Sequence, residues 1–385
     1  MRMRSRTYLD WASAAPPTAA AFRAFLKGTK HFGNPSAPHM EGREAKKVVE
    51  EARTRIARLM EVKADDVIFT SGATEANALA LAGALKGSGR SLPDLHILYL
   101  PTAHSSSLRT IEGLGREGVQ IEPLHITEGA VDLARLAAQL RQETYLISID
   151  VVCGETGTRY DVRGIRRALV EAGRSDVLIH ADASQLPMIE SITRARLGAD
   201  LITLDAQKVG GVRGAGLLVA PRYIPLQPIV EGGGQERGLR SGTEPSALIA
   251  AFAASLSECQ KGHGDFSRHS TSLRARLLAD IDSIEGLVIN GGKAQVPHIL
   301  NLSLLGRDTD YLVALLDERG YAVSTRSSCE TDAEGSRVVL YMTGDAVRAA
   351  STLRVSFGPS TREGEIRRFA KALIETVAFL DSYTG

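Results

Sequence analysis

A lysine and an aspartate stand at matching places in the sequence, each at the end of a short apolar run. Asp182 ends the run VLIHAD, and Lys208 follows the run LITLD about one βα step further along the chain. Ligands of open α/β sheets bind beyond the carboxyl ends of the strands, so both side chains are expected there. A lysine amine can form a Schiff base with the aldehyde of pyridoxal phosphate, and a carboxylate can pair with its pyridinium nitrogen. From these two residues alone, two unrelated charges at strand ends are an equally good interpretation.

The segment TSGATE at residues 70–75 could supply the anion site that such a cofactor needs. It follows a predicted strand and opens an apolar-periodic segment. Free backbone N–H groups at the start of a helix bind anions, so the turn around Ala73 would hold a phosphate, with the Thr74 hydroxyl as a further donor. A glycine turn with a capping threonine is common, and the motif alone is weak. His104 follows a third predicted strand, where it is either an ordinary polar loop residue or a ring lying flat on the pyridine.

Cys329 is the third residue that could do chemistry. It lies in the polar stretch VSTRSSCETDAEGS, which has neither a helical nor a strand period and is predicted to be an exposed loop. Exposure suits a nucleophilic thiol, but a tolerated surface cysteine is the commoner explanation in an intracellular protein. Cys153 and Cys259 are expected to be packed and inert.

The elements that must position these residues follow an alternating pattern. Short apolar runs alternate with helical patterns and predict strands at residues 67–70, 96–100, 145–150, 177–180, 201–204 and 216–220. This rhythm favours βαβ units, and therefore an α/β fold whose mainly parallel sheet is covered by helices. Apolar residues at helical spacing predict one such helix over residues 45–60.

The length predicts two domains, because 385 residues exceed the size at which one hydrophobic core usually stops growing. Residues 262–265 are polar and contain glycine, which suits a linker. We therefore expect a large cofactor-binding domain at 16–262 and a smaller α+β domain at 263–385, together with 1–15, that carries the Cys329 loop. The closing helix is expected to begin with a capping box formed by Ser360 and Glu363.

Charge and composition exclude several classes of protein. With 46 basic and 45 acidic residues the net charge is +1, so no overall field attracts nucleic acid, and direct binding of nucleic acid is not expected. No apolar run approaches the roughly 20 residues that span a bilayer, so no membrane partner is expected. The three cysteines have no metal-like spacing, which predicts no metal site and a reducing compartment, the cytoplasm.

Together these positions resemble the cysteine desulfurase family, pyridoxal-phosphate enzymes of the class-V aminotransferase type with fold type I, nearly from end to end. The matching motifs are YLD at 8–10, FGNPS at 32–36 with His39, SGATEAN at 71–77, the positions of His104, Asp182, Gln185 and Lys208, GGGQER at 232–237, RSGT at 240–243, SSC at 327–329 and LRVS at 353–356. The resemblance implies a homodimer that converts L-cysteine to L-alanine, with Lys208 holding the cofactor and Cys329 receiving the sulfur as a persulfide. A sulfur-acceptor protein or a small thiol would then take the sulfur. The pathway it would serve, whether iron–sulfur cluster assembly, transfer RNA thiolation or DNA modification, stays open.

The same resemblance implies roles for individual side chains. Cofactor contacts are expected from Ala73, Thr74, His104, Asp182, Gln185, Gln207, Lys208 and Thr243. Gln185 would bond the ring hydroxyl, and Thr243 would reach the phosphate bound by the other subunit. Arg354 would hold the substrate carboxylate as a bidentate fork, with Asn34 as a second substrate-binding residue. His104 would shuttle the proton of the substrate thiol. Without the resemblance, Arg354 on a strand-like segment would be interpreted as part of a structural ion pair.

Four features depart from the family pattern, and two of them are Ala14 and Ala15 in place of paired threonines and a slightly shorter, more acidic loop after Cys329. Gly154 stands where asparagine is usual, which removes a donor unless water or a neighbour replaces it. Asp205 and Gln207 stand where serine and histidine usually donate to the phosphate. An ionised carboxylate cannot donate, so Asp205 is expected to turn away toward Arg213 or Arg237. The departures keep two other interpretations open: a transaminase or lyase of the same fold in which the loop cysteine is incidental, and a degenerate copy that acts as a partner protein in sulfur transfer.

Overall fold

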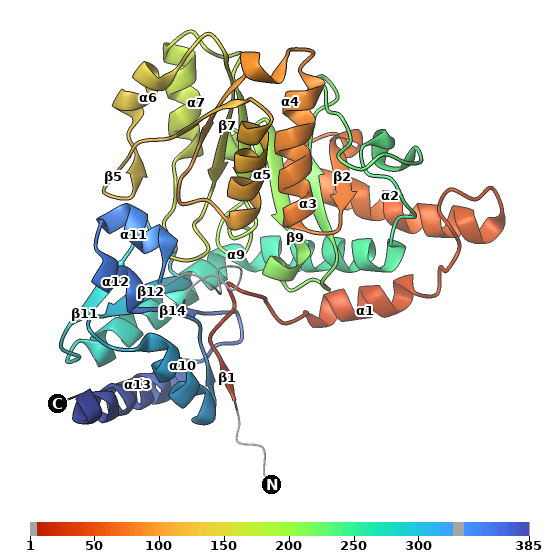
Figure 1. Cartoon of the computed structure of the whole chain (residues 1–385). Coiled ribbons are helices and arrows are strands. Elements are labelled where there is room, and N and C mark those ends of the chain that lie inside the picture. The colour runs from red at the N-terminus through yellow and green to blue at the C-terminus, as the bar shows by residue number, and fades with distance from the viewer. Residues whose placement is uncertain (1–5, 326–334, 385) are drawn as a thin grey trace.

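A seven-stranded sheet forms the centre of the molecule (Figure 1). The computed structural model describes residues 6–325 and 335–384. The strand order is β2 (Val67–Thr70), β10 (Gly216–Val219), β9 (Leu201–Asp205), β8 (Leu178–Asp182), β7 (Thr144–Asp150), β3 (His96–Tyr99) and β4 (Gln120–Pro123). Within this sheet only β10 runs antiparallel to its neighbours. The predicted α/β class with a mainly parallel sheet is therefore confirmed.

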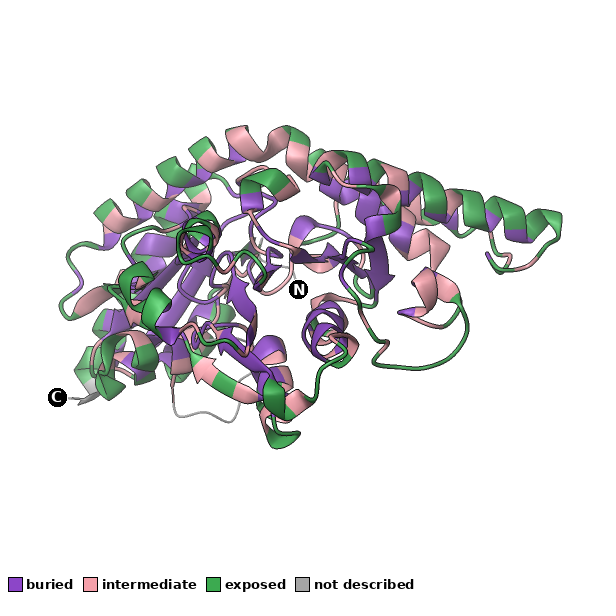
Figure 2. Ribbon diagram, turned by 90° about the horizontal axis from the view of Figure 1, so that it is seen from above, coloured by how far each residue is buried: buried purple, intermediate pink, exposed green. Residues whose placement is uncertain are grey.

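Helices cover both faces of the sheet, and alternate side chains of each strand pack on opposite sides. Phe69 and Leu217 belong to one hydrophobic core, which also takes side chains of α2, α7 and α9, whereas Ile68 and Leu218 belong to a second core with α3, α4 and α5. Burial on both faces explains why these strands read as continuous apolar runs. Figure 2 shows the buried strands between helices whose outer faces are exposed. The helices around this sheet are α1 (Ala19–Gly28), α2 (Met40–Met60), α3 (Ala73–Ala78), the π-helix η2 (Leu79–Gly83), α4 (Ala84–Gly87), α5 (Ser105–Arg116), α6 (Leu133–Gln139), α7 (Val162–Glu171), α8 (Arg194–Leu197), and the short 3-10 helices η1 (Ala64–Asp66), η3 (Leu92–Asp94), η4 (Ala206–Val209) and η5 (Gln235–Gly238).

A smaller antiparallel sheet builds a separate hydrophobic core. Its strands are β11 (Leu287–Asn290), β12 (Ile299–Leu304) and β14 (Thr352–Ser356), in that order. Leu302, Val355 and Phe369 lie in this core together with Leu9 from the start of the chain. Strand β1 (Thr7–Tyr8) pairs in parallel with β13 (Tyr321–Ala322), so the N-terminal segment packs with the C-terminal part of the chain. The remaining elements are β1 (Thr7–Tyr8), β5 (Ile126–Thr127), β6 (Ala130–Val131), α10 (Thr309–Glu318), β13 (Tyr321–Ala322), α11 (Arg337–Thr343), α12 (Ala346–Ala350) and α13 (Glu363–Thr384).

The expected linker at 262–265 is wrong, because helix α9 (Ser246–Ile281) runs through it. Phe252 in the first half of α9 packs in the core of the main sheet, and Leu277 in the second half packs in the core of the small sheet. Packing on both sides outweighs the roughly 1 kcal/mol that each glycine costs inside a helix. Since α9 is shared by both cores, a domain boundary between residues 262 and 263 stays a prediction.

The closing helix also begins differently from the prediction. The carboxylate that reaches back is that of Glu365, which accepts the backbone N–H of Arg362 at 2.8 Å. Glu363 is the first helical residue, and its carboxylate pairs with Arg367 one turn along. The predicted capping box of Ser360 and Glu363 is therefore two residues out of place. None of the helices in the described residues is long and apolar enough to cross a lipid bilayer.

Candidate active site

The carboxyl ends of three neighbouring strands each carry an aspartate. Asp150 ends β7, Asp182 ends β8 and Asp205 ends β9. The register of β7 and β8 places Asp150 beside Asp182. A cavity of about 290 Å³ opens beyond these strand ends, where open α/β sheets bind ligands. The predicted site residues that line it are Ala73, Thr74, His104, Asp182, Gln185, Gln207, Lys208 and Arg354.

Lys208 is held at the wall of this cavity by the N-terminal segment. The 3-10 helix η4 follows β9 directly and carries the lysine into the cavity wall. Its Nζ donates to the carbonyl oxygens of Ala12 at 2.9 Å and Ser13 at 2.7 Å. The same segment is tied to η4 by a hydrogen bond from the Ala15 N–H to the Gln207 carbonyl at 2.8 Å. The position of the amine is therefore set by backbone contacts from residues far away in the sequence.

A chain of hydrogen bonds joins Asp182 to His104. The Asp182 carboxylate accepts from the Asn77 amide at 2.8 Å, and the same amide nitrogen lies 3.0 Å from Ser106 Oγ. Ser106 Oγ lies 2.8 Å from His104 Nδ1, which also accepts the Ser106 backbone N–H at 3.2 Å. These contacts assign the proton of a neutral imidazole to Nε2. Sequence reasoning missed Asn77 as a site residue, although it lies one helical turn after Ala73.

Asp150 is a second buried carboxylate that sequence reasoning missed. Its Oδ2 accepts the backbone N–H of His104 at 2.9 Å. Burial, followed by the charge of Asp182, raises the pKa of Asp150 to about 7. The signal was present in the sequence, because Asp150 ends the apolar run TYLISID just as Asp182 ends its own strand.

Arg354 reaches the cavity from the small sheet. It is buried, and its Nη2 donates to Asp10 at 2.8 Å and to Ser13 Oγ at 2.5 Å, while Nη1 donates to the Gly154 carbonyl at 3.0 Å. Its buried Nε has no hydrogen-bond partner among the described residues. A carboxylate could accept from this unused N–H, so the side chain has both the structural ion pair and a donor left for a ligand.

Gly154 leaves room that Gln185 occupies. A Cβ atom at position 154 would lie 3.1 Å from Gln185 Nε2, closer than ordinary van der Waals contact. Gln185 Nε2 donates to the Ala12 carbonyl at 2.9 Å, beside the Lys208 amine that binds the same oxygen. An amide donor therefore stands next to the position where the side chain is missing.

The expectation that Asp205 turns toward Arg213 or Arg237 is wrong. Its Oδ2 accepts the backbone N–H of Ala73 at 3.0 Å, and its Oδ1 accepts the N–H of Gln207 at 2.9 Å. The reason is that N–H groups in the first turn of a helix lack intrahelical partners and attract a carboxylate. Arg237 instead donates to the carbonyl oxygens of residues 65 and 220.

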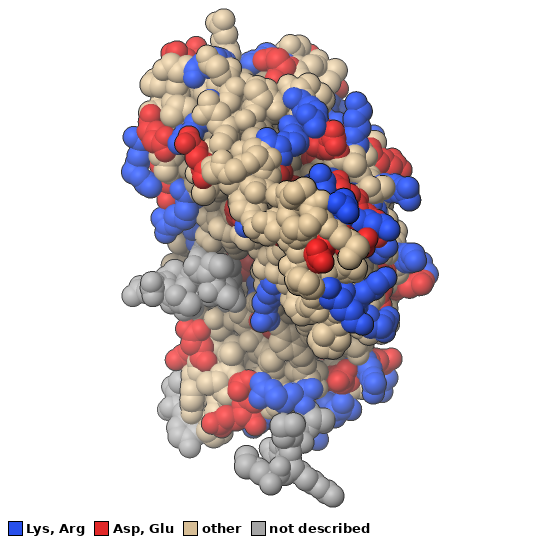
Figure 3. Space-filling model, turned by 90° about the vertical axis from the view of Figure 1, so that its right-hand side faces the viewer, with Lys and Arg blue, Asp and Glu red and all other residues tan. Residues whose placement is uncertain are grey.

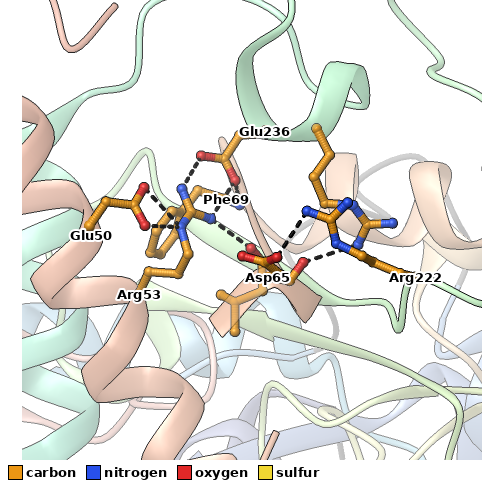
Figure 4. Close-up of polar contacts among 8 residues, drawn as sticks. Glu50, Arg53, Asp65, Phe69, Arg222 and Glu236 are labelled. Atoms are coloured by element: carbon orange, nitrogen blue, oxygen red, sulfur yellow. Dashed lines mark hydrogen bonds and ion pairs between the residues drawn. The ribbon is translucent and has the colours of Figure 1, made fainter. Parts of the chain in front are cut away.

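The loop that carries Thr243 is anchored by contacts outside the cavity. Arg53 donates to both carboxylate oxygens of Glu236, at 2.8 and 2.6 Å, and Glu236 also accepts the Phe69 N–H at 2.8 Å (Figure 4). Asn34 Nδ2 lies 3.5 Å from Thr243 Oγ1, and neither residue lines the cavity of its own chain. Their contacts with substrate and phosphate therefore stay predictions.

Two of the three cysteines, Cys153 and Cys259, lie among the described residues. Cys329 lies outside the described residues. Cys153 is buried in the cavity wall, and burial, followed by the charge of Glu155, raises the pKa of its thiol. Burial raises the pKa of Cys259 to about 12. Neither of these two thiols is activated, as predicted.

Comparison with known proteins decides the family. Residues 7–369 match the aminotransferase class-V family. The chain belongs to this family. It is 32% identical over 370 residues to the cysteine desulfurase IscS 1 of Archaeoglobus fulgidus, covering 95% of each chain. A solved NifS-like protein superposes with a TM-score of 0.91 at 26% identity, covering 97% of this chain and 100% of that one. A structure of SspA in complex with cysteine gives 0.79 at 26% identity, with 92% and 99% covered.

As a class-V aminotransferase in the cysteine desulfurase branch, the chain is a pyridoxal-phosphate enzyme, and its cavity fits the ring and aldehyde ends of that cofactor. A lysine amine and a buried carboxylate face the same cavity from neighbouring strand ends, and Ser184 Oγ there is buried with no partner among the described residues. The end of the cavity that would hold the phosphate fits less well, because the Asp205 carboxylate already accepts the Ala73 N–H. The residues thus fit the cofactor, with one acidic departure.

Proposed function

We propose that this class-V aminotransferase converts L-cysteine to L-alanine and passes the sulfur to Cys329 as a persulfide, for delivery to an acceptor protein or a small thiol. The observation that carries the proposal is that Lys208, Asp182 and Arg354 line one cavity although they come from two different sheets. An amine for the cofactor, a carboxylate for its ring nitrogen and a cation for an amino-acid carboxylate are the parts that the reaction needs.

Each side chain has a separate task in this proposal. When bound, pyridoxal phosphate supplies an electron sink for the bonds at the substrate α-carbon. Lys208 holds the cofactor and moves the α-proton once its amine is released. Asp182 is kept as an acceptor toward the ring nitrogen by the hydrogen bonds from Asn77 and from the Ser184 N–H, at 2.8 and 3.0 Å. Gln185 donates to the ring hydroxyl.

Arg354 and His104 bind the substrate. The unused Nε–H of Arg354 donates to the substrate carboxylate, while the Asp10 contact fixes the guanidinium plane. His104 holds its proton at Nε2, because Ser106 occupies Nδ1. We propose that this Nε2–H donates a hydrogen bond to the sulfur of the substrate. For the ring to take the thiol proton as a shuttle, its own proton must first move to Nδ1, where Ser106 Oγ can accept it.

The sulfur step needs a nucleophile separate from the cofactor. The Cys329 thiolate attacks the substrate sulfur, so that an S–S bond forms and the Cβ–S bond breaks. The electron pair of the broken bond stays with carbon, which takes up a proton and leaves as alanine. The sulfur is thereby oxidised relative to the thiol and remains on the protein as the persulfide.

We also propose a homodimer, in the cytoplasm, in which Thr243 reaches the phosphate bound by the other subunit and Asn34 contributes to the substrate site. Support comes from the apolar side chains of Phe22, Phe32 and Met40, which are 55%, 82% and 63% exposed. Figure 3 looks onto the side of the molecule where α1 ends and α2 begins, and the middle of this face is largely uncharged. An uncharged, partly apolar face suits contact with a second copy.

Product analysis tests the reaction. The purified chain is incubated with L-cysteine and a thiol reductant, and alanine, sulfide and pyruvate are measured. The proposal predicts alanine and sulfide in equal amounts. Pyruvate and ammonia in place of alanine would show a lyase, and transfer of the amino group to a keto acid would show a transaminase.

A further inference from the structure

Two acidic side chains occupy backbone donors of the turn that opens α3. Glu75 accepts the Ser71 N–H at 2.6 Å, and Asp205 accepts the Ala73 N–H at 3.0 Å. Helix α3 continues through the π-helix η2 into α4, so the helical stretch runs from Ala73 to Gly87. The N–H groups that would bind the cofactor's phosphate are thus partly taken by the chain's own carboxylates.

The two carboxylates differ in charge compensation. Glu75 is paired with Arg240, whose Nε lies 3.1 Å from Oε1. Asp205 is buried, and no cationic side chain among the described residues lies within ion-pair distance of it. A buried carboxylate without a counter-ion, held only by N–H groups, repels a second anion placed beside it.

Asp205 also shares one cavity with the phosphate donors and the reactive amine. It lines the same cavity as Ala73, Thr74 and Lys208, and it is three residues before the lysine. A phosphate group carries nearly two negative charges at neutral pH. To take the Ala73 N–H, this phosphate must displace the carboxylate while remaining close to it.

We infer that Asp205 determines how strongly this chain binds the phosphate of its cofactor, because its carboxylate competes with that phosphate for the Ala73 N–H and repels it. The inference rests on the proposed pyridoxal-phosphate function. The chain should therefore bind pyridoxal phosphate only slightly more tightly than pyridoxal, which has the same ring and aldehyde but carries no phosphate.

Binding of two ligands to three chains tests the inference. The parent chain, Asp205→Asn and Asp205→Ser are equilibrated with pyridoxal phosphate or with pyridoxal, and the dissociation constants are read from cofactor absorbance. Asparagine keeps the size of the side chain and removes its charge, while serine also supplies a hydroxyl donor. The ratio of the two dissociation constants should change by about tenfold or more in favour of pyridoxal phosphate in both variants, and the change should shrink at high salt.

Each outcome has one meaning. Pyridoxal affinity that is unchanged across the three chains shows that the variants are folded and that the ring end is intact. An unchanged ratio in both variants would overturn the inference while leaving the proposed function in place. A gain confined to Asp205→Ser would overturn the charge argument, since asparagine removes the same charge. A parent chain that binds neither ligand would contradict the proposed function itself.

Discussion

Replacing Asp150 by asparagine should make the cofactor-free chain more stable at neutral and alkaline pH. The carboxylate is buried between Asp182 and the N–H of His104, and its pKa is raised from 3.8 to about 7. Between these two values the folded state holds a proton that the unfolded state has lost. The contribution of Asp150 to stability therefore falls as the pH rises through this window and is constant above it. At pH 8 the ionised Asp150 lowers the free energy of unfolding by at most about 4 kcal/mol.

Urea unfolding of the parent and Asp150→Asn chains at pH 5 and pH 8 measures this cost. The asparagine can still accept the His104 N–H, so the contact is kept while the titration is removed. The stability difference between variant and parent should grow by about 3 kcal/mol from pH 5 to pH 8. The buried His180, whose pKa burial lowers to about 4, is present in both chains and cancels in the difference. Asp265→Asn, at an exposed position, is the control for the substitution itself. A difference that stays the same at both pH values would refute the reasoning.

Two further predictions concern the cofactor lysine and the anchored loop. Borohydride treatment of the yellow holoenzyme should fix the cofactor on the peptide that contains Lys208, as mass spectrometry would show, and label on any other lysine would refute the assignment. Glu236→Gln should lower the free energy of unfolding by up to about 3 kcal/mol, because it removes the buried charge partner of Arg53 and leaves only the half-exposed Glu50 beside it; a loss below about 1 kcal/mol in urea unfolding would show that the pair is not needed to hold the loop.

The elements that sequence reasoning predicted well are those whose burial is local in the sequence. Each of the six predicted strands overlaps a strand of the main sheet, because a strand buried on both faces must be apolar throughout. The linker at 262–265 could not be excluded from its polar composition, since the helix there is stabilised by two cores made mostly of distant residues. Strand β4 was missed because its side chains alternate between exposed and partly buried at the sheet edge.

In the candidate site, too, some residues could be predicted from the sequence and others could not. Lys208, Asp182 and His104 were predictable, because strand ends of a parallel sheet converge at one edge. The partner of Asp205 was not, since the choice between a distant arginine and the Ala73 N–H depends on which group the fold brings within 3.0 Å. The roles of Asn34 and Thr243 depend on a second copy of the chain, which no pattern within one sequence describes.

Sulfur transfer to Cys329 can be followed directly in one experiment. The parent and Cys329→Ser chains, both carrying the cofactor, receive a pulse of L-cysteine without reductant, and the peptides are then analysed by mass spectrometry alongside an alanine assay. One added sulfur atom is expected on Cys329 of the parent and none on the buried Cys153 or the half-buried Cys259. The variant should keep its cofactor absorbance but make no alanine. Alanine formed by Cys329→Ser at the parent rate, or sulfur found on Cys153 or Cys259, would contradict sulfur transfer to Cys329.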